Sequence, residues 1–137
     1  MIVLDTSALS AVMHGAAAAV DRLRVVAPSD VILVAPVAAE IRFGLERLPR
    51  GSRRRRLLED EYARIRGAVR WEDWSEEAAD EFGRQKARLA RLGRLIEDFD
   101  LAIGSIAIVL DAGLATLNAR HMVRIRGLSV EDWSEGV

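Results

Sequence analysis

Four polar side chains stand where short apolar runs end or begin. Asp5 follows directly on one such run, Glu40 lies one turn into the helix predicted after a second, and Asn118 comes two residues after a third. Asp100 precedes a nearly all-apolar segment, 101–110, predicted to be a helix buried on most sides. In open parallel sheets, ligands bind at the carboxyl ends of the strands. We therefore expect Asp5, Glu40 and Asn118 at one such edge, with Asp100 joining them if its helix begins there.

The chemistry that this set favours is metal-dependent. Carboxylates brought together without basic partners repel one another, which raises their pKa values. A divalent cation removes that repulsion. Mg²⁺ and Mn²⁺ prefer oxygen ligands, and Mg²⁺ is usually held by one or two carboxylates with water and substrate phosphate completing its shell. Because such an ion can activate water and stabilise a leaving oxygen, the set indicates phosphodiester hydrolysis.

Composition limits the alternatives. The 137 residues, 50% of them hydrophobic, suit a single domain over 1–137 with one core. A net charge of −1 gives no general attraction to polyanions, so any contact with nucleic acid must be local. The absence of cysteine and the presence of only two histidines argue against thiolate and histidine-rich metal sites. Because no basic segment precedes a long apolar stretch, we expect no signal peptide and no membrane span, and hence a cytoplasmic protein.

Short β-branched runs alternate with long amphipathic stretches. Strands are predicted at 2–4, 31–34, 69–71 and 114–116, with 128–130 as a last edge strand. This alternation predicts an α/β fold, a three-layer α/β/α sandwich around a parallel sheet.

Residues typical of helix starts precede the amphipathic stretches, and Gly93 is typical of a helix end. The predicted starts are Ser7 as a cap, Pro36 in a first turn, Gly51-Ser52 before a helix over 53–65, Ser75 before one reaching about residue 92, and Asp98 or Asp100 before the buried helix.

Four motifs in this order resemble those of the PIN-domain family, and within it the toxins called VapC. They are Ile2-Val3-Leu4-Asp5-Thr6-Ser7, Ala39-Glu40-Ile41-Arg42-Phe43-Gly44, Asp98-Phe99-Asp100-Leu101-Ala102-Ile103 and Thr116-Leu117-Asn118, and the likeness extends through 127–133. The resemblance implies a PIN-like fold and an endoribonuclease toxin of a type II toxin–antitoxin pair. Such a toxin cuts RNA with Mg²⁺ or Mn²⁺, is silenced by a VapB-like antitoxin and forms a homodimer.

The resemblance also assigns roles by position. The acidic metal ligands would be Asp5, Glu40 and Asp100, with Asn118 as the fourth catalytic residue. Ser7 and Thr116 would orient ligands or water, and Asp98 would support the site. Asn118 departs from the family pattern, because many members have aspartate there. An amide brings no charge, so a second metal would be held weakly.

Each assignment has a plainer alternative. Asp5 could only cap the first helix, Glu40 could be a solvated carboxylate, and Asn118 and Thr116 could be turn and strand-end residues. Asp98 and Asp100 compete for the role of metal ligand, because one can cap the helix while the other points into the site. Asp100 fits the family position better.

Other candidates outside the site also have two interpretations. Residues 53–56, all arginine, could bind RNA phosphates but are more simply a solvated helix face. His121 could donate a proton, although no partner is visible in the sequence. Trp71, Trp74 and Trp133 are predicted in the core or at an interface. The runs at 43–45 and 57–58 could form one apolar groove for an antitoxin or face the core.

Two other classes compete with a nuclease. A haloacid dehalogenase phosphatase would need a second aspartate where Ser7 stands, and a receiver domain would need a lysine after a late strand, whereas the only lysine is Lys86. The remaining alternative is a catalytically weakened PIN-fold binding or regulatory module, which the uncharged Asn118 keeps open.

Overall fold

The computed structural model describes residues 1–136, and its elements alternate along the chain as an α/β fold requires. In chain order they are β1 (Ile2–Leu4), α1 (Thr6–Met13), α2 (Ala17–Arg24), the 3₁₀ turn η1 (Pro28–Asp30), β2 (Val31–Val34), α3 (Ala35–Glu46), α4 (Arg53–Ala68), β3 (Arg70–Glu72), α5 (Glu76–Arg91), α6 (Asp98–Val109), β4 (Gly113–Thr116), α7 (Ala119–Met122) and β5 (Val130–Asp132).

The five strands form one sheet in the order β3-β2-β1-β4-β5, and every neighbouring pair is parallel. Val3 at the centre is in register with Ile32 of β2 and Leu114 of β4. All three side chains are fully buried, as expected for parallel strands covered on both faces. The predicted parallel α/β sheet is therefore confirmed.

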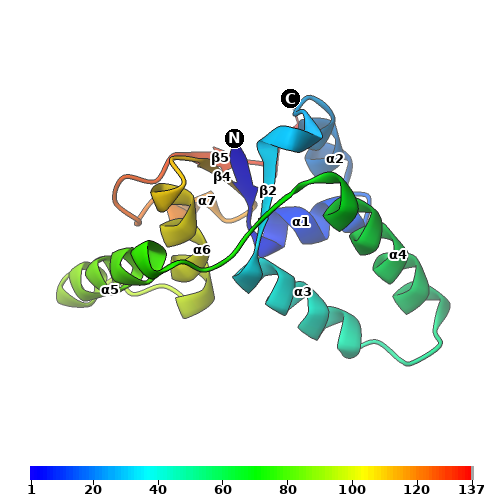
Figure 1. Cartoon of the computed structure of the whole chain (residues 1–137), viewed down its shortest axis with the longest axis horizontal. Coiled ribbons are helices and arrows are strands. Elements are labelled where there is room, and N and C mark those ends of the chain that lie inside the picture. The colour runs from blue at the N-terminus through cyan, green and yellow to red at the C-terminus, as the bar shows by residue number, and fades with distance from the viewer. Residues whose placement is uncertain (137) are drawn as a thin grey trace.

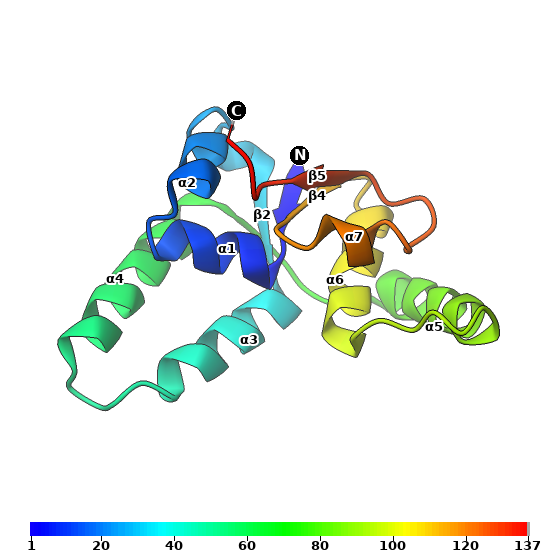
Figure 2. The same ribbon diagram turned by 180° about the vertical axis from the view of Figure 1, so that it is seen from behind.

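Helices cover both faces of this sheet. The chain first winds outward from β1 to β3 and then crosses to β4 and β5, so right-handed crossovers place the two sets of helices on opposite faces. Figures 1 and 2 show α1 to α4 grouped on one side and α5 to α7 on the other. The arrangement is the predicted three-layer sandwich.

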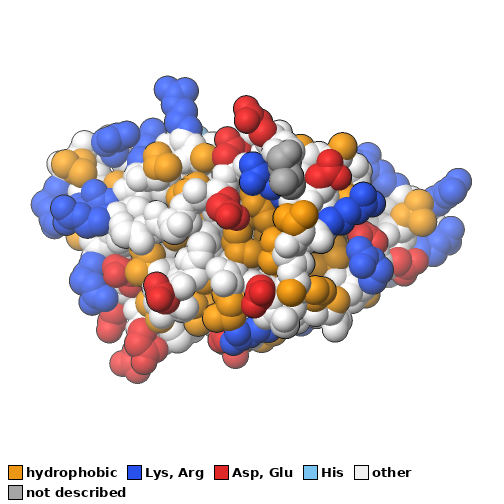
Figure 3. All heavy atoms as spheres, turned by 90° about the horizontal axis from the view of Figure 1, so that it is seen from above, with side chains coloured by type: hydrophobic (Ala, Val, Ile, Leu, Met, Phe, Trp, Pro, Cys, Tyr) orange, Lys and Arg blue, Asp and Glu red, His pale blue; other side chains and the backbone are white. Residues whose placement is uncertain are grey.

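The strands β1 and β2 run downward in Figure 1, so their carboxyl ends, where α1 and α3 begin, lie at the lower edge. The opposite edge, seen in Figure 3, shows acidic, basic and apolar side chains mixed, with Lys and Arg gathered mainly toward the two ends.

Several predicted helix boundaries are confirmed. Ser52 and Ser75 each accept the backbone N–H three residues ahead, and so cap α4 and α5. Pro36 stands in the first turn of α3, and Gly93, just after α5, has a positive φ of 66° that glycine adopts without strain. The helix α4 continues to Ala68, beyond the predicted end at residue 65.

Two capping predictions are wrong. Ser7 lies inside α1, and the cap of α1 is Asp5, whose side chain accepts the N–H of Ala8. Asp98 and Asp100 do not cap α6 either: both lie within its first turn, where acidic side chains are favoured by the helix dipole.

The outer strands deviate most from their predicted ranges. The third strand is Arg70–Glu72 instead of 69–71, and the last is Val130–Asp132 instead of 128–130. The pairing of Val130 with Leu114 sets the register of β5, and this register depends on the neighbouring strand rather than on local sequence.

The tryptophans divide between core and surface. Trp133 is 1% exposed and belongs to the core, as predicted. Trp71 and Trp74 are 40% and 46% exposed, so of the two predicted positions the core is excluded and an interface stays a prediction.

No helix within residues 1–136 combines the length and the apolar character needed to cross a membrane.

Candidate active site

Asp5 is a buried carboxylate, 2% exposed, at the end of β1. Its Oδ1 accepts two hydrogen bonds, from Ser7 Oγ at 2.6 Å and from the N–H of Ala8 at 2.8 Å. Among the described residues no hydrogen bond reaches Oδ2. Asp5 is therefore an N-cap through one oxygen and keeps the other free, so the capping role and the ligand role do not exclude each other.

The hydroxyls of Ser7 and Thr116 connect β1 to β4. Ser7 Oγ accepts the N–H of Leu117 at 2.9 Å and lies 3.4 Å from Thr116 Oγ1. Since the hydrogen of Ser7 is directed to Asp5, Thr116 is the donor between the two hydroxyls. Thr116 Oγ1 in turn accepts the N–H of Asn118 at 2.9 Å. These bonds fix the loop after β4 against the start of α1.

Glu40 reaches the same edge from α3. Its Oε1 accepts a hydrogen bond from Thr6 Oγ1 at the short distance of 2.5 Å, while Oε2 accepts no hydrogen bond within residues 1–136. Sequence reasoning missed Thr6 as a site residue, although it stands next to Asp5 in the same motif.

Asp100 lies half-buried in the first turn of α6. Burial, together with the negative charges of Asp5, Glu40 and Glu97, raises the pKa of Asp100 to about 6. In the described part of the chain Asp100 has neither a hydrogen-bonding partner nor a cationic one. Four carboxylates at this edge are therefore near enough for their charges to affect Asp100; Glu97, three residues before Asp100, was not predicted.

Two other residues predicted at the site, Asp98 and Asn118, each interact with a side chain that was not predicted there. Asp98 is exposed and its Oδ1 lies 3.0 Å from Lys86 Nζ, so the first turn of α6 is tied to α5. Asn118 is half-buried, and its Nδ2 lies 2.7 Å from His121 Nδ1. The partner of His121 that the sequence could not show is therefore Asn118.

Two hollows open beside the first turn of α6, and both include Asp100. One, of about 550 Å³, is lined by Ala39, Glu40, Phe43, Glu97, Asp98, Phe99 and Asp100. The other, of about 520 Å³, is lined by Leu95, Ile96, Glu97, Asp98, Asp100, His121 and Arg124. Asp100 therefore borders both hollows.

The donor set can be compared with the needs of a metal ion. Within residues 1–136 no three acidic or histidine side chains are grouped closely enough to hold an ion together as they stand. Mg²⁺ does not require this, because one or two carboxylates suffice when water and phosphate complete its shell. Within the described residues, Asp5 and Asp100 offer unpaired carboxylate oxygens with no competing cation, so the chemistry of these residues fits one such ion.

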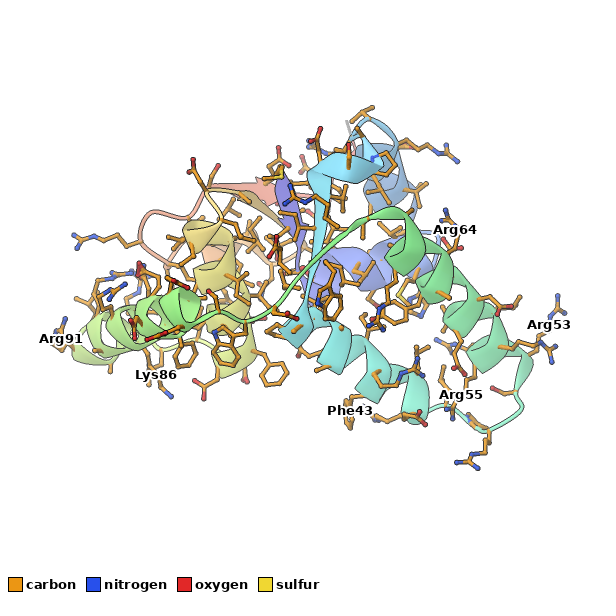
Figure 4. The ribbon with its side chains drawn as sticks, in the orientation of Figure 1. Phe43, Arg53, Arg55, Arg64, Lys86 and Arg91 are labelled. Atoms are coloured by element: carbon orange, nitrogen blue, oxygen red, sulfur yellow. The ribbon has the colours of Figure 1, made fainter. Side chains whose placement is uncertain are left out.

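The arginine run at 53–56 lies far from this edge, at the outer end of α4 (Figure 4). Arg53, Arg54 and Arg56 are exposed. Arg55 is largely covered and forms ion pairs with Glu46 at 2.7 Å and Glu59 at 2.8 Å. The solvated-face interpretation describes the run better than a phosphate-binding one.

The family follows from comparison with known proteins. The model of the PIN domain matches residues 2–128, and this chain belongs to the PIN-domain family. The tRNA(fMet)-specific endonuclease VapC of Shigella flexneri is 39% identical over 62 residues, 45% of this chain. The match covers 47% of that relative, so the chain spans about half its length.

Solved structures of toxin–antitoxin proteins share the fold. VapBC2 from Rickettsia felis, bound to a promoter DNA fragment, gives a TM-score of 0.85 at 24% identity over 97% of this chain and 99% of that one. VapBC-5 from Mycobacterium tuberculosis, of the VapBC family of toxin–antitoxin systems, gives 0.63 at 21% identity over 98% and 97%. At these identities the likeness establishes the fold.

The raised pKa of Asp100 predicts how stability depends on pH without metal. The folded protein keeps a proton that the unfolded chain releases between about pH 4 and pH 6, so the contribution of Asp100 to stability falls as the pH rises through that interval. Asp100→Asn should therefore unfold at a higher temperature than the wild type at pH 7.5 in EDTA, and the difference should disappear near pH 4. Thermal melts at several pH values test this. A wild type that is the more stable of the two at pH 7.5 would show that the four carboxylates do not repel in the fold.

Proposed function

We propose that this chain, as one domain over 1–137, is an endoribonuclease that depends on Mg²⁺ or Mn²⁺ and is the toxin of a VapBC-like pair. Asp5, Asp100 and Glu40 are its metal-binding residues and Asn118 its fourth catalytic residue. The observation that supports this most is that Asp5, Glu40 and Asp100 lie at one sheet edge, where their charges act on one another with no cationic partner among residues 1–136. A fold that brings carboxylates together without compensation is destabilised unless a cation joins them.

The proposed reaction is hydrolysis of an RNA phosphodiester, in which water adds to phosphorus and the P–O3′ bond breaks, leaving a 5′-phosphate and a 3′-hydroxyl. When bound, the metal ion would polarise the phosphate and the attacking water. Asp5 and Asp100 would hold it through their free oxygens, with Glu40 as third ligand. Ser7 and Thr116 keep Asp5 and the loop carrying Asn118 in place through the hydrogen bonds described above. Asp98 supports the site by tying α6 to α5.

An antitoxin has a fitting surface on the α1–α4 side. A groove of about 700 Å³ lies between α1, α2 and α4. Its lining is mainly apolar and includes Val12, Met13, Val20, Leu23, Val26, Leu57, Ile65 and Val69, together with the charged Arg24, Glu61 and Arg64. We refer to it as the α4 groove. Leu57 is 54% exposed in it, so a large apolar side chain stands open to water unless a partner covers it.

The antitoxin groove expected from the sequence is not one surface. Phe43 lines the hollow beside Glu40, Leu57 lines the α4 groove, and Leu45 is buried in the core. The two runs are separated because the first lies on α3 and the second on α4. We assign the VapB-like antitoxin to the α4 groove.

Removing one metal-binding carboxylate tests the catalytic proposal. Asp5→Asn and Asp100→Asn should each lower cleavage of single-stranded RNA at least about 100-fold, since even partners that only orient metal ligands contribute 10- to 100-fold. Gel analysis of labelled RNA with Mg²⁺ measures this, and circular dichroism checks that both variants fold. Asp60→Asn, which changes an exposed aspartate on α4, is the matched control and should cut like the wild type.

Metal binding is tested separately. Calorimetry should detect Mn²⁺ binding to the wild type and weaker binding to Asp100→Asn. A wild type that binds no Mn²⁺ and cuts no RNA would instead be the binding module.

A single substitution in the α4 groove should separate toxin activity from its inhibition. Leu57→Arg places a charge in the apolar lining and should release a copurifying antitoxin from the tagged chain expressed in its own host, while RNA cleavage by the purified chain stays unchanged. Leu92→Arg, also an exposed leucine but outside the groove, should keep the partner. Mass spectrometry of the eluted proteins identifies what is lost. Retention of the same small protein by Leu57→Arg would move the antitoxin site elsewhere.

The homodimer expected from the family resemblance is tested by mass in solution. Light scattering of the purified chain should give twice the 15.1 kDa mass of one copy. A single-copy mass across the accessible concentrations would remove the dimer from the proposal.

A further inference from the structure

The hollow between α6 and the α7 segment contains two side chains that the proposed mechanism does not use. Apart from Leu95 and Ile96, its lining consists of Glu97, Asp98 and Asp100 on the α6 side, and His121 and Arg124 on the α7 side. Three carboxylates would repel an anionic substrate, so a phosphate that enters needs compensation from hydrogen-bond donors as well as from the proposed metal ion. His121 and Arg124 are the donors among the lining residues.

The hydrogen bond to Asn118 determines which nitrogen of His121 is free. Asn118 Nδ2 carries two hydrogens and no acceptor lone pair, so His121 Nδ1, 2.7 Å away, is the acceptor. A neutral imidazole that accepts at Nδ1 carries its hydrogen on Nε2. His121 is exposed, and Nε2–H is therefore a donor available to a ligand.

Arg124 has most of its hydrogen-bonding capacity unused. Its Nη1 lies 3.5 Å from the carbonyl oxygen of Leu95, at the limit of a hydrogen bond. Its Nε is buried without a partner, and within residues 1–136 Arg124 forms no ion pair, although carboxylates line the same hollow. A guanidinium has five N–H donors in a planar fork that matches phosphate oxygens.

The backbone that carries these residues is held by α5. Gln85, 6% exposed, donates from Nε2 to the carbonyl oxygen of Arg126 at 2.8 Å and accepts the N–H of Arg126 at 3.1 Å. Arg88 donates to the carbonyl oxygen of Arg124. The segment after α7 is thus fixed before any ligand arrives, which lowers the entropy lost on binding.

We propose that His121, through Nε2–H, and Arg124, through its guanidinium, bind non-bridging oxygens of the RNA phosphate group that lies beside Asp100. This assignment rests on the proposed ribonuclease function and adds the residues that position its substrate. Asn118 then has a second role: its amide hydrogen orients His121, and its Oδ1 remains free to face the site.

The test measures RNA binding separately from cleavage. Fluorescence anisotropy of a labelled single-stranded RNA of mixed sequence is recorded with Mg²⁺ in an Asp5→Asn background, and cleavage is measured with Asp5 intact. His121→Ala should weaken binding about two- to tenfold, the range for one neutral hydrogen bond, and Arg124→Ala about ten- to a hundredfold. Because only the arginine displaces a counterion, Arg124→Ala should reduce the slope of log affinity against log salt by about 0.7, whereas His121→Ala should leave that slope unchanged.

Two control variants separate phosphate binding from structural effects. His121→Gln places an amide N–H near the position of Nε2 but cannot accept at Nδ1, so it should recover most of the affinity if Nε2–H contacts RNA. Arg53→Ala removes an exposed arginine at the far end of α4 (Figure 4) and should change neither affinity nor salt slope.

Each other outcome has a definite meaning. If the wild type cuts RNA but His121→Ala and Arg124→Ala bind and cut it equally well, the phosphate assignment is wrong and the ribonuclease proposal stands. If the wild type cuts no RNA, the ribonuclease proposal fails, and with it the assignment. If the two variants instead change the mass measured by light scattering, the hollow is a contact between copies and the assignment is wrong.

Discussion

Asp5 carries a buried carboxylate, 2% exposed, and such a group must accept hydrogen bonds because an uncompensated buried charge is severely destabilising. The hydrogen bonds that Asp5 accepts organise the whole edge of the sheet. Oδ1 accepts from Ser7 and from the first turn of α1, which fixes the direction in which α1 leaves β1. Ser7 also accepts the N–H of Leu117, so the same group holds the end of β4. One buried anion therefore joins two neighbouring strands and a helix, and leaves a single free oxygen in a defined place.

The parallel sheet makes this local arrangement useful. Because β1, β2 and β4 run in the same direction, the chain leaves all three at one edge, and the residues that follow each strand meet there. Glu40 arrives on α3, bonded to Thr6, and Asp100 arrives on α6 from the opposite face. The site therefore includes groups from both helical layers, which no single helix or loop could bring together.

Repulsion within this group links stability to function. The pKa of Asp100 is raised because burial and three neighbouring carboxylates disfavour its charge. The ion that would complete the proposed site would also relieve the repulsion, so the proposed cofactor and the folded state stabilise each other. The donors on the opposite wall of the hollow are His121 and Arg124. They would act on the substrate in the same sense, by balancing the negative charge of the RNA phosphate, which the carboxylates repel.

The sequence alone determined the features that depend on local pattern. Buried strands are recognisable because they are short and β-branched, and the starts of α4 and α5 because a serine caps each. The alternation of short β-branched runs with amphipathic stretches was enough to predict the α/β class. The four motifs around Asp5, Glu40, Asp100 and Asn118 carried the PIN resemblance and the predicted set of site residues. Only the tertiary structure showed that Thr6 holds Glu40, that Glu97 joins the carboxylates, that Asn118 is paired with His121, and that β5 begins at Val130. These features depend on which strands and helices are neighbours in space. A hydrogen bond between residues 34 positions apart, such as Thr6 to Glu40, leaves no trace in either local sequence.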